Sequence, residues 1–144
     1  MEAVPIKLLE WSAEYSFHSE EFDREHQLWF DLVNRLHQAM LAGKGVELLQ
    51  TLAHELIAHT LAHFAHEEQL MVAVNYPDFA AHAQIHQEFR GTAAVFMQRF
   101  ERGDTTMTIE LLHFLSEAVP QHIMTNDRQL AEYLTAHSSF TMTD

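Results

Sequence analysis

The chain has 144 residues and a formal net charge of −13, from 8 Lys and Arg against 21 Asp and Glu. This length predicts one domain, residues 1–144, and 47% hydrophobic residues suffice for a core without disulfides. Because the chain has no cysteine, thiolate metal sites, iron–sulfur clusters and cysteine nucleophiles are excluded. Any bound metal ion must therefore be held by imidazole and carboxylate groups, and the chain has 12 histidines.

The acidic balance argues against nucleic acid and anionic membranes as partners, because both require basic patches. The N-terminal residues MEAVPIKLLEW lack the basic-then-apolar order of a secretory signal. No apolar run approaches the roughly 20 residues that span a bilayer. We therefore expect a soluble protein of the cytoplasm, and no pattern indicates a protein partner.

Three turn clusters divide the chain into four long segments that lack the alternation of strands. We predict helices over residues 19–41, 46–74, 78–102 and 106–136. Short breaks between long amphipathic helices are typical of an all-α, up-down-up-down antiparallel four-helix bundle. Two ends remain, and we expect residues 1–18 to form an N-terminal arm and residues 137–144 a frayed tail.

Each segment carries its own signals along the chain. Trp11, Tyr15 and Phe17 are suited to anchoring the arm on the bundle. In segment 19–41, Ser19 is a plausible N-cap, and His26 lies on a stripe of apolar residues that recur every three or four positions.

The two middle segments each place a pair of metal-ligating residue types one turn apart. Segment 46–74 carries His63 and Glu67 on its apolar stripe. Segment 78–102 begins at Asp78, a suitable N-cap, and carries His82 and His86 on its inner face.

The fourth segment, 106–136, has an expected buried stripe that runs from Ile109 and includes His122. Pro120 predicts a kink just before His122. Asp127 follows His122 by five residues, which is about 140° around an ideal helix. For both side chains to face one site, the chain needs a π-bulge, a distortion from Pro120, or an ion between the two directions.

All four predicted helices thus offer polar residues on apolar faces: His26, His63, Glu67, His82, His86, His122 and Asp127. Each could be a hydrogen-bonded core residue, but burying all of them without a shared partner would cost several kcal/mol. Five imidazoles and two carboxylates exceed the four ligands of one zinc ion. They suit two metal ions that share the carboxylates, and the ligand types favour iron or manganese.

These motifs, taken in order from Trp11 to Leu134, resemble the bacterial hemerythrins. The matching pieces are Trp11 and Tyr15, Asp23-Arg24-Glu25-His26, His63-Phe64-x-x-Glu67-Glu68-x-x-Met71, Tyr76-Pro77, His82-x-x-x-His86, Phe89, and His122-Ile123 with Asp127.

The resemblance implies an oxo- or hydroxo-bridged non-haem di-iron centre inside a four-helix bundle. It assigns one iron to three histidines, the other to two, and the bridges to two carboxylates: His82, His86 and His122; His26 and His63; Glu67 and Asp127. The two-histidine iron then keeps an open position, at which the family binds dioxygen.

Some residues depart from the family pattern. Ala118 and Val119 stand where the family commonly has Trp-Leu, which walls the oxygen pocket, so we expect a wider pocket and easier oxidation to the diferric form. His59 stands where tyrosine is common, and we favour a hydrogen-bonded core residue over a ligand. Glu25 replaces a usual glutamine, and we expect it to be a solvated charge. We expect the histidines without ligand spacing at the surface: His37, His54, His66, His113 and His137.

The leading functional hypothesis is a non-enzymatic, reversible carrier, store or local supplier of dioxygen. One alternative is an enzyme that reduces peroxide or nitric oxide at the same centre. The others are an oxygen or redox sensor module and a metal-storage protein.

Overall fold

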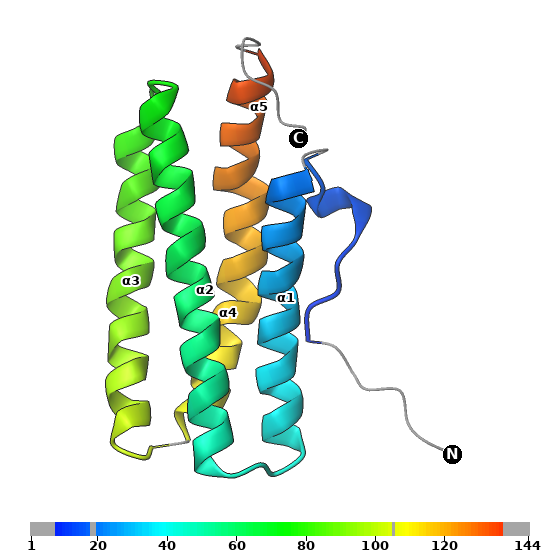
Figure 1. Ribbon diagram of the computed structural model, residues 1–144, viewed down its shortest axis with the longest axis vertical. Coiled ribbons are helices and arrows are strands. Elements are labelled where there is room, and N and C mark those ends of the chain that lie inside the picture. The colour runs from blue at the N-terminus through cyan, green and yellow to red at the C-terminus, as the bar shows by residue number, and fades with distance from the viewer. Residues whose placement is uncertain (1–7, 18–19, 105, 137–144) are drawn as a thin grey trace.

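The computed structural model describes residues 8–17, 20–104 and 106–136, and within these ranges it is helical with no strand. Four rods stand side by side (Figure 1). The first three rods are α1 (Glu20–Leu41), α2 (Val46–Ala73) and α3 (Phe79–Glu101). The fourth rod consists of α4 (Met107–His122), the π-helical segment η2 (Ile123–Asp127) and α5 (Arg128–Ala136). The predicted all-α bundle is confirmed.

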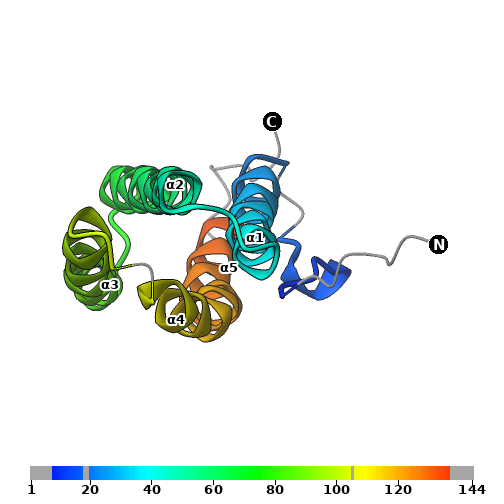
Figure 2. The same ribbon diagram turned by 90° about the horizontal axis from the view of Figure 1, so that it is seen from below.

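The rods form a closed ring, as the end-on view in Figure 2 shows. Helix α1 packs against α2 and α4, and α3 packs against α2 and α4. The short turns use left-handed backbone at Gly43, Asn75 and Gly103, a conformation that glycine and asparagine adopt at low cost. No helix in the described part of the chain is long and apolar enough to cross a membrane.

The predicted helix boundaries agree with the structure to within two residues, but two details differ. Asp78 precedes α3 without a capping hydrogen bond from its side chain. The predicted N-cap Ser19 lies outside the described residues and stays a prediction. Ile109, predicted to be buried, has 65% of its surface exposed. The first turn of α4 instead directs Thr108 and Leu111 into the interior.

The arm is held against α1 by a buried amide. The Leu9 N–H donates to Asn34 Oδ1 over 2.8 Å, and Asn34 Nδ2 donates to the Leu9 carbonyl over 2.7 Å. Trp11 and Tyr15 each pack edge-on against Phe30, with ring centroids 5.4 and 5.0 Å away. Residues 8–17 therefore cover one side of α1 (Figure 1).

The π-helical segment η2 explains the five-residue spacing between His122 and Asp127. A π-helix has more residues per turn than an α-helix, so a residue five positions on returns to the same side. Both side chains are consequently buried in the bundle, at 4% and 1% exposure. Of the three explanations that the sequence left open, the structure contains the π-bulge.

Replacing Asn34 with Ala is expected to lower the free energy of unfolding by about 1–3 kcal/mol, because the peptide groups of Leu9 lose both partners. Thermal unfolding measures the loss, and hydrogen exchange at the Leu9 amide localises it. The matched control is Gln27→Ala, an exposed position on the same helix. Equal stability of the two variants would contradict this account of the arm.

Candidate metal centre

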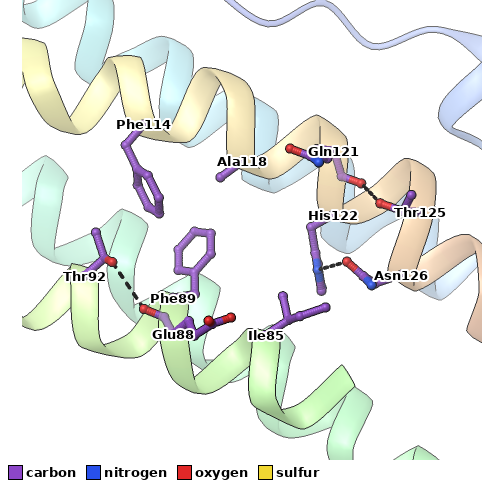
Figure 3. Close-up of a pocket in the computed structure, with 10 residues that line it drawn as sticks. All are labelled: Ile85, Glu88, Phe89, Thr92, Phe114, Ala118, Gln121, His122, Thr125 and Asn126. Atoms are coloured by element: carbon purple, nitrogen blue, oxygen red, sulfur yellow. Dashed lines mark hydrogen bonds between the residues drawn. The ribbon is translucent and has the colours of Figure 1, made fainter. Parts of the chain in front are cut away.

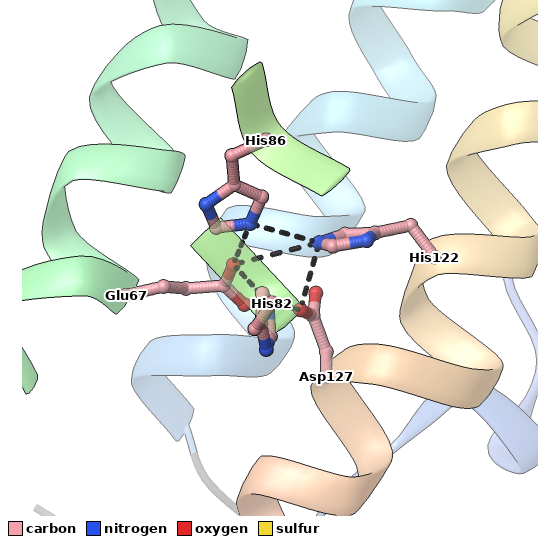
Figure 4. A group of neighbouring side chains, drawn as sticks. All are labelled: Glu67, His82, His86, His122 and Asp127. Carbon is pink, nitrogen blue, oxygen red and sulfur yellow. Dashed lines mark hydrogen bonds and ion pairs between the residues drawn. The ribbon is translucent and has the colours of Figure 1, made fainter. Parts of the chain in front are cut away.

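All seven predicted polar residues converge inside the bundle, and none is more than 4% exposed. Each of the four rods contributes at least one of these side chains. Figure 4 shows five of the seven side chains, with His82 and His86 reaching in from α3 and His122 and Asp127 from the fourth rod. The seven divide into two overlapping groups whose ligand atoms all lie within 4.8 Å of one another.

The larger group contains three imidazoles and one oxygen from each carboxylate. His86 Nε2 lies 3.0 Å from Glu67 Oε1, and His122 Nε2 lies 3.0 Å from Asp127 Oδ1. His82 Nε2 is 3.4 Å from both of these oxygens. Five potential ligand atoms therefore surround one point (Figure 4).

The smaller group contains two imidazoles and the other oxygen of each carboxylate. His26 Nε2 lies 3.0 Å from Asp127 Oδ2. His63 Nε2 lies 3.3 Å from Glu67 Oε2 and 3.5 Å from Asp127 Oδ2. Each carboxylate thus divides its two oxygens between the groups, which is the arrangement that a bridging carboxylate requires.

The spacing of these atoms fits metal ions. Ligand atoms about 2.1 Å from one ion lie about 3 Å apart when they are neighbours in an octahedron. The separations of 3.0 to 3.5 Å between nitrogen and oxygen atoms match that value. Both oxygens of Glu67 are also buried without a hydrogen-bond partner in the described chain, and a metal ion would satisfy them.

The orientation of the imidazoles gives a second, independent test. The Nδ1 atoms of His86 and His122 donate hydrogen bonds to Glu68 Oε2 and Asn126 Oδ1, over 2.7 and 3.1 Å. In a neutral imidazole the other nitrogen, Nε2, then carries a lone pair. The two Nε2 atoms lie only 3.2 Å apart, so their lone pairs repel unless positive charge lies beside them. A cation fits this donor set.

Without a metal ion, protons supply that positive charge. Burial by itself lowers the pKa of His122, but the charge of Asp127 and its hydrogen bond raise the pKa to about 10. Burial likewise opposes the charged form of His63, yet Glu67 and Asp127 hold its pKa well above the usual value. Burial raises the pKa of Asp127, but the charge of His122 outweighs it and holds that pKa well below the ordinary range.

Several partners of the ligand imidazoles were missed or misjudged in the sequence. Glu25, expected to be solvated, accepts a 2.5 Å hydrogen bond from His63 Nδ1 and a 2.8 Å bond from His66 Nδ1. His66 is therefore not simply a surface residue. His59 is hydrogen-bonded, as expected, through Nε2 to the Glu25 carbonyl. No sequence signal identifies these pairs, because they join residues 34 to 41 positions apart.

Aromatic side chains enclose the site. Phe64 stacks on the His86 ring with centroids 3.9 Å apart and planes 8° apart. Trp29 lies 5.3 Å from the His63 ring and 5.8 Å from Phe64, and it is fully buried. The polar groups are thus surrounded by aromatic side chains, and charge interactions are strong in such an environment.

The metal-free protein is expected to lose stability as the pH rises. The pKa of His122 is about 10 when folded against 6.5 when unfolded, so its stabilisation is complete below pH 6.5 and is lost as the pH approaches 10. Thermal unfolding from pH 6 to pH 10 measures this loss. The metal-loaded protein should lack it, because its imidazoles are already neutral ligands; identical profiles would contradict this assignment of charge.

Replacing Asp127 with Asn is expected to reduce metal binding from two ions to one or none per chain, since an amide lacks the charge and the second ligand oxygen. Metal analysis after iron loading under anaerobic conditions measures the stoichiometry. The control is His113→Ala, whose side chain is 76% exposed and whose one ion-pair partner in the described residues is Glu117. Two tightly bound ions in the Asp127 variant would disprove its bridging role.

Comparison with known proteins agrees with this geometry. The family model "Hemerythrin HHE cation binding domain" matches residues 18–134. The chain is 30% identical to a bacteriohemerythrin of Stenotrophomonas maltophilia, over 92% of this chain and 85% of the relative. It is also 30% identical to a bacteriohemerythrin of Methylococcus capsulatus, over 91% of this chain and all of the relative.

Solved structures show the same fold. A wild-type hemerythrin superposes with a TM-score of 0.73 at 28% identity, covering 87% of this chain and 96% of the other. A single-site mutant of hemerythrin superposes with a TM-score of 0.80 at 28% identity, covering 88% and 97%. The family's cofactor is a non-haem di-iron centre, and the buried histidine and carboxylate cluster suits such a centre. The chain therefore belongs to the hemerythrin family.

Proposed function

We propose that this protein binds dioxygen reversibly at its di-iron centre and serves as a carrier, store or local supplier of dioxygen in the cytoplasm. We assign one iron to His82, His86 and His122, and the other iron to His26 and His63. Glu67 and Asp127 are assigned as the carboxylates that bridge the two. When bound, the iron pair supplies the electrons that reversible oxygen binding requires.

The observation that carries this proposal is the unequal number of donors in the two groups. The larger group offers three nitrogens and two oxygens, and the smaller offers two nitrogens and two oxygens. These residues would hold one iron with five protein ligand atoms and the other with four. The side of His26 and His63 would therefore be the one that has room for a small molecule.

The composition of the cluster favours reversible binding over cleavage of the O–O bond. Five imidazoles and two carboxylates leave the centre more positive than a carboxylate-rich shell would. A more positive centre donates electron density less readily. Trp29 and Phe64, which pack against the His63 and His86 rings, are fully buried. Val119 is fully buried as well, and it is not among the residues that line the cavity beside the centre. The buried indole N–H of Trp29 has no partner in the described chain, so it remains available to a small polar ligand.

A cavity beside the centre favours a second candidate function. It has a volume of about 320 Å³ between α3 and α4 and reaches His122. Figure 3 shows Ala118 and Phe114 of α4 facing Phe89 and Ile85 of α3 across it. This space far exceeds what one small molecule needs. The cavity borders the three-histidine half through His122, and neither His26 nor His63 lines it. An enzyme that reduces peroxide or nitric oxide would use it as a route for water and larger ligands toward the centre.

One experiment separates the two functions. Iron-loaded protein, reduced under nitrogen and then aerated, should develop an optical spectrum that disappears again under vacuum. Repeated cycles without loss support the carrier. Turnover of peroxide or nitric oxide with a reductant, and no reversible oxygenated form, would overturn the carrier in favour of the enzyme.

Replacing Ala118 with Trp is expected to fill part of the cavity and slow oxidation to the diferric form several-fold, because less water reaches the centre. The decay of the oxygenated spectrum measures this rate. The matched control is Ser116→Trp, a bulky substitution two residues earlier whose position is not among the residues lining this cavity. An unchanged decay rate in the Ala118 variant would show that the cavity does not control oxidation.

A further inference from the structure

Glu25 is placed to act on the two-histidine half of the centre. Glu25 directly precedes His26 on α1, and its side chain is only 24% exposed. One carboxylate oxygen accepts the His63 Nδ1 hydrogen bond over 2.5 Å. The backbone at this position is fixed as well, because His59 of α2 hydrogen-bonds the Glu25 carbonyl over 2.9 Å.

The three-histidine half has a similar contact with a different charge balance. Glu68 Oε2 accepts the His86 Nδ1 hydrogen bond over 2.7 Å, and the same oxygen pairs with Arg90 over 3.0 Å. The guanidinium offsets the negative charge of Glu68. In the described chain, the ion-pair partners of Glu25 are two imidazoles, His63 and His66. The carboxylate on the two-histidine half therefore keeps more of its charge for the ligand imidazole.

We infer that Glu25 is a positioning residue that makes His63 a stronger electron donor and so lowers the reduction potential of the two-histidine iron. An imidazole whose Nδ1–H is bonded to a carboxylate has one fixed tautomer and a more basic Nε2. A more basic nitrogen stabilises ferric over ferrous iron. The inference rests on the proposed di-iron function and adds a direction to it: this chain favours oxidation at the iron assigned to the open position.

Two other carboxylates near the site, Glu68 and Glu21, serve as controls for Glu25. Because Arg90 already offsets Glu68, removing the charge of Glu68 changes less than removing the charge of Glu25. Glu21 lies one turn before Glu25 on α1 and reaches His66 Nε2 over 3.2 Å, and no ion pair joins it to His63 in the described chain. These three carboxylates separate an effect through His63 from a general effect of charge near the site.

The test uses the iron-loaded full chain. Glu25→Gln preserves the length and an acceptor oxygen but removes the charge. We expect its midpoint potential, measured by anaerobic redox titration, to shift upward, and its iron affinity, measured by chelator competition, to fall about 10- to 100-fold. Glu68→Gln should shift the potential less, and so should Glu21→Gln, since Glu21 reaches Glu25 only through the shared His66 in the described chain.

A second variant covers the possibility that the first is poorly folded. Glu25→Asp keeps the charge but withdraws it by one methylene, so the potential should again rise, with helicity checked by circular dichroism. Unchanged potential and affinity in both Glu25 variants, or an equal shift in Glu21→Gln, would overturn the inference while the di-iron function stands. Failure of the unmodified chain to bind two irons would instead overturn both.

Discussion

Two buried carboxylates determine how this bundle is organised. Glu67 and Asp127 are fully buried, and each divides its oxygens between two groups of imidazoles. Two uncompensated charges at that depth would cost far more than the fold can supply. Positive charge must therefore be present, either as protons on the histidines or as metal ions. Each rod must also keep its position, since every rod contributes at least one of the compensating or bridging groups.

The outer nitrogens of the imidazoles connect this interior to the half-buried surface. Three of the five histidines donate through Nδ1, to Glu25, Glu68 and Asn126. These three acceptors differ in charge. The Glu25 carboxylate is shared between two histidines, the Glu68 carboxylate is shared with an arginine, and Asn126 offers a neutral amide oxygen. A symmetrical donor set would treat the two metal positions alike. This graded set does not, and the asymmetry agrees with a centre whose halves have different tasks.

Patterns within single helices could be predicted from the sequence, but contacts between helices could not. Turn residues bounded the rods, and the four-residue spacing of His63 to Glu67 and of His82 to His86 indicated pairs on one face. Glu25 was misjudged because its partner lies on another helix, and single-helix periodicity contains no information about the rotation of neighbours. Ile109 was misplaced because one turn of apolar residues fits two rotations of a helix end equally well.

The π-helical segment links the metal centre to the packing of α5. One extra residue in the turn rotates everything after it by roughly 100° relative to an uninterrupted α-helix. With this rotation, Leu130 and Leu134 face the interior and are buried, as Asp127 is. A one-residue deletion that restored regular spacing would expose an apolar stripe and, by the same rotation, turn the Asp127 carboxylate away from the buried cluster. The irregular turn is therefore held in place by the apolar packing of the helix end as well as by the buried polar cluster.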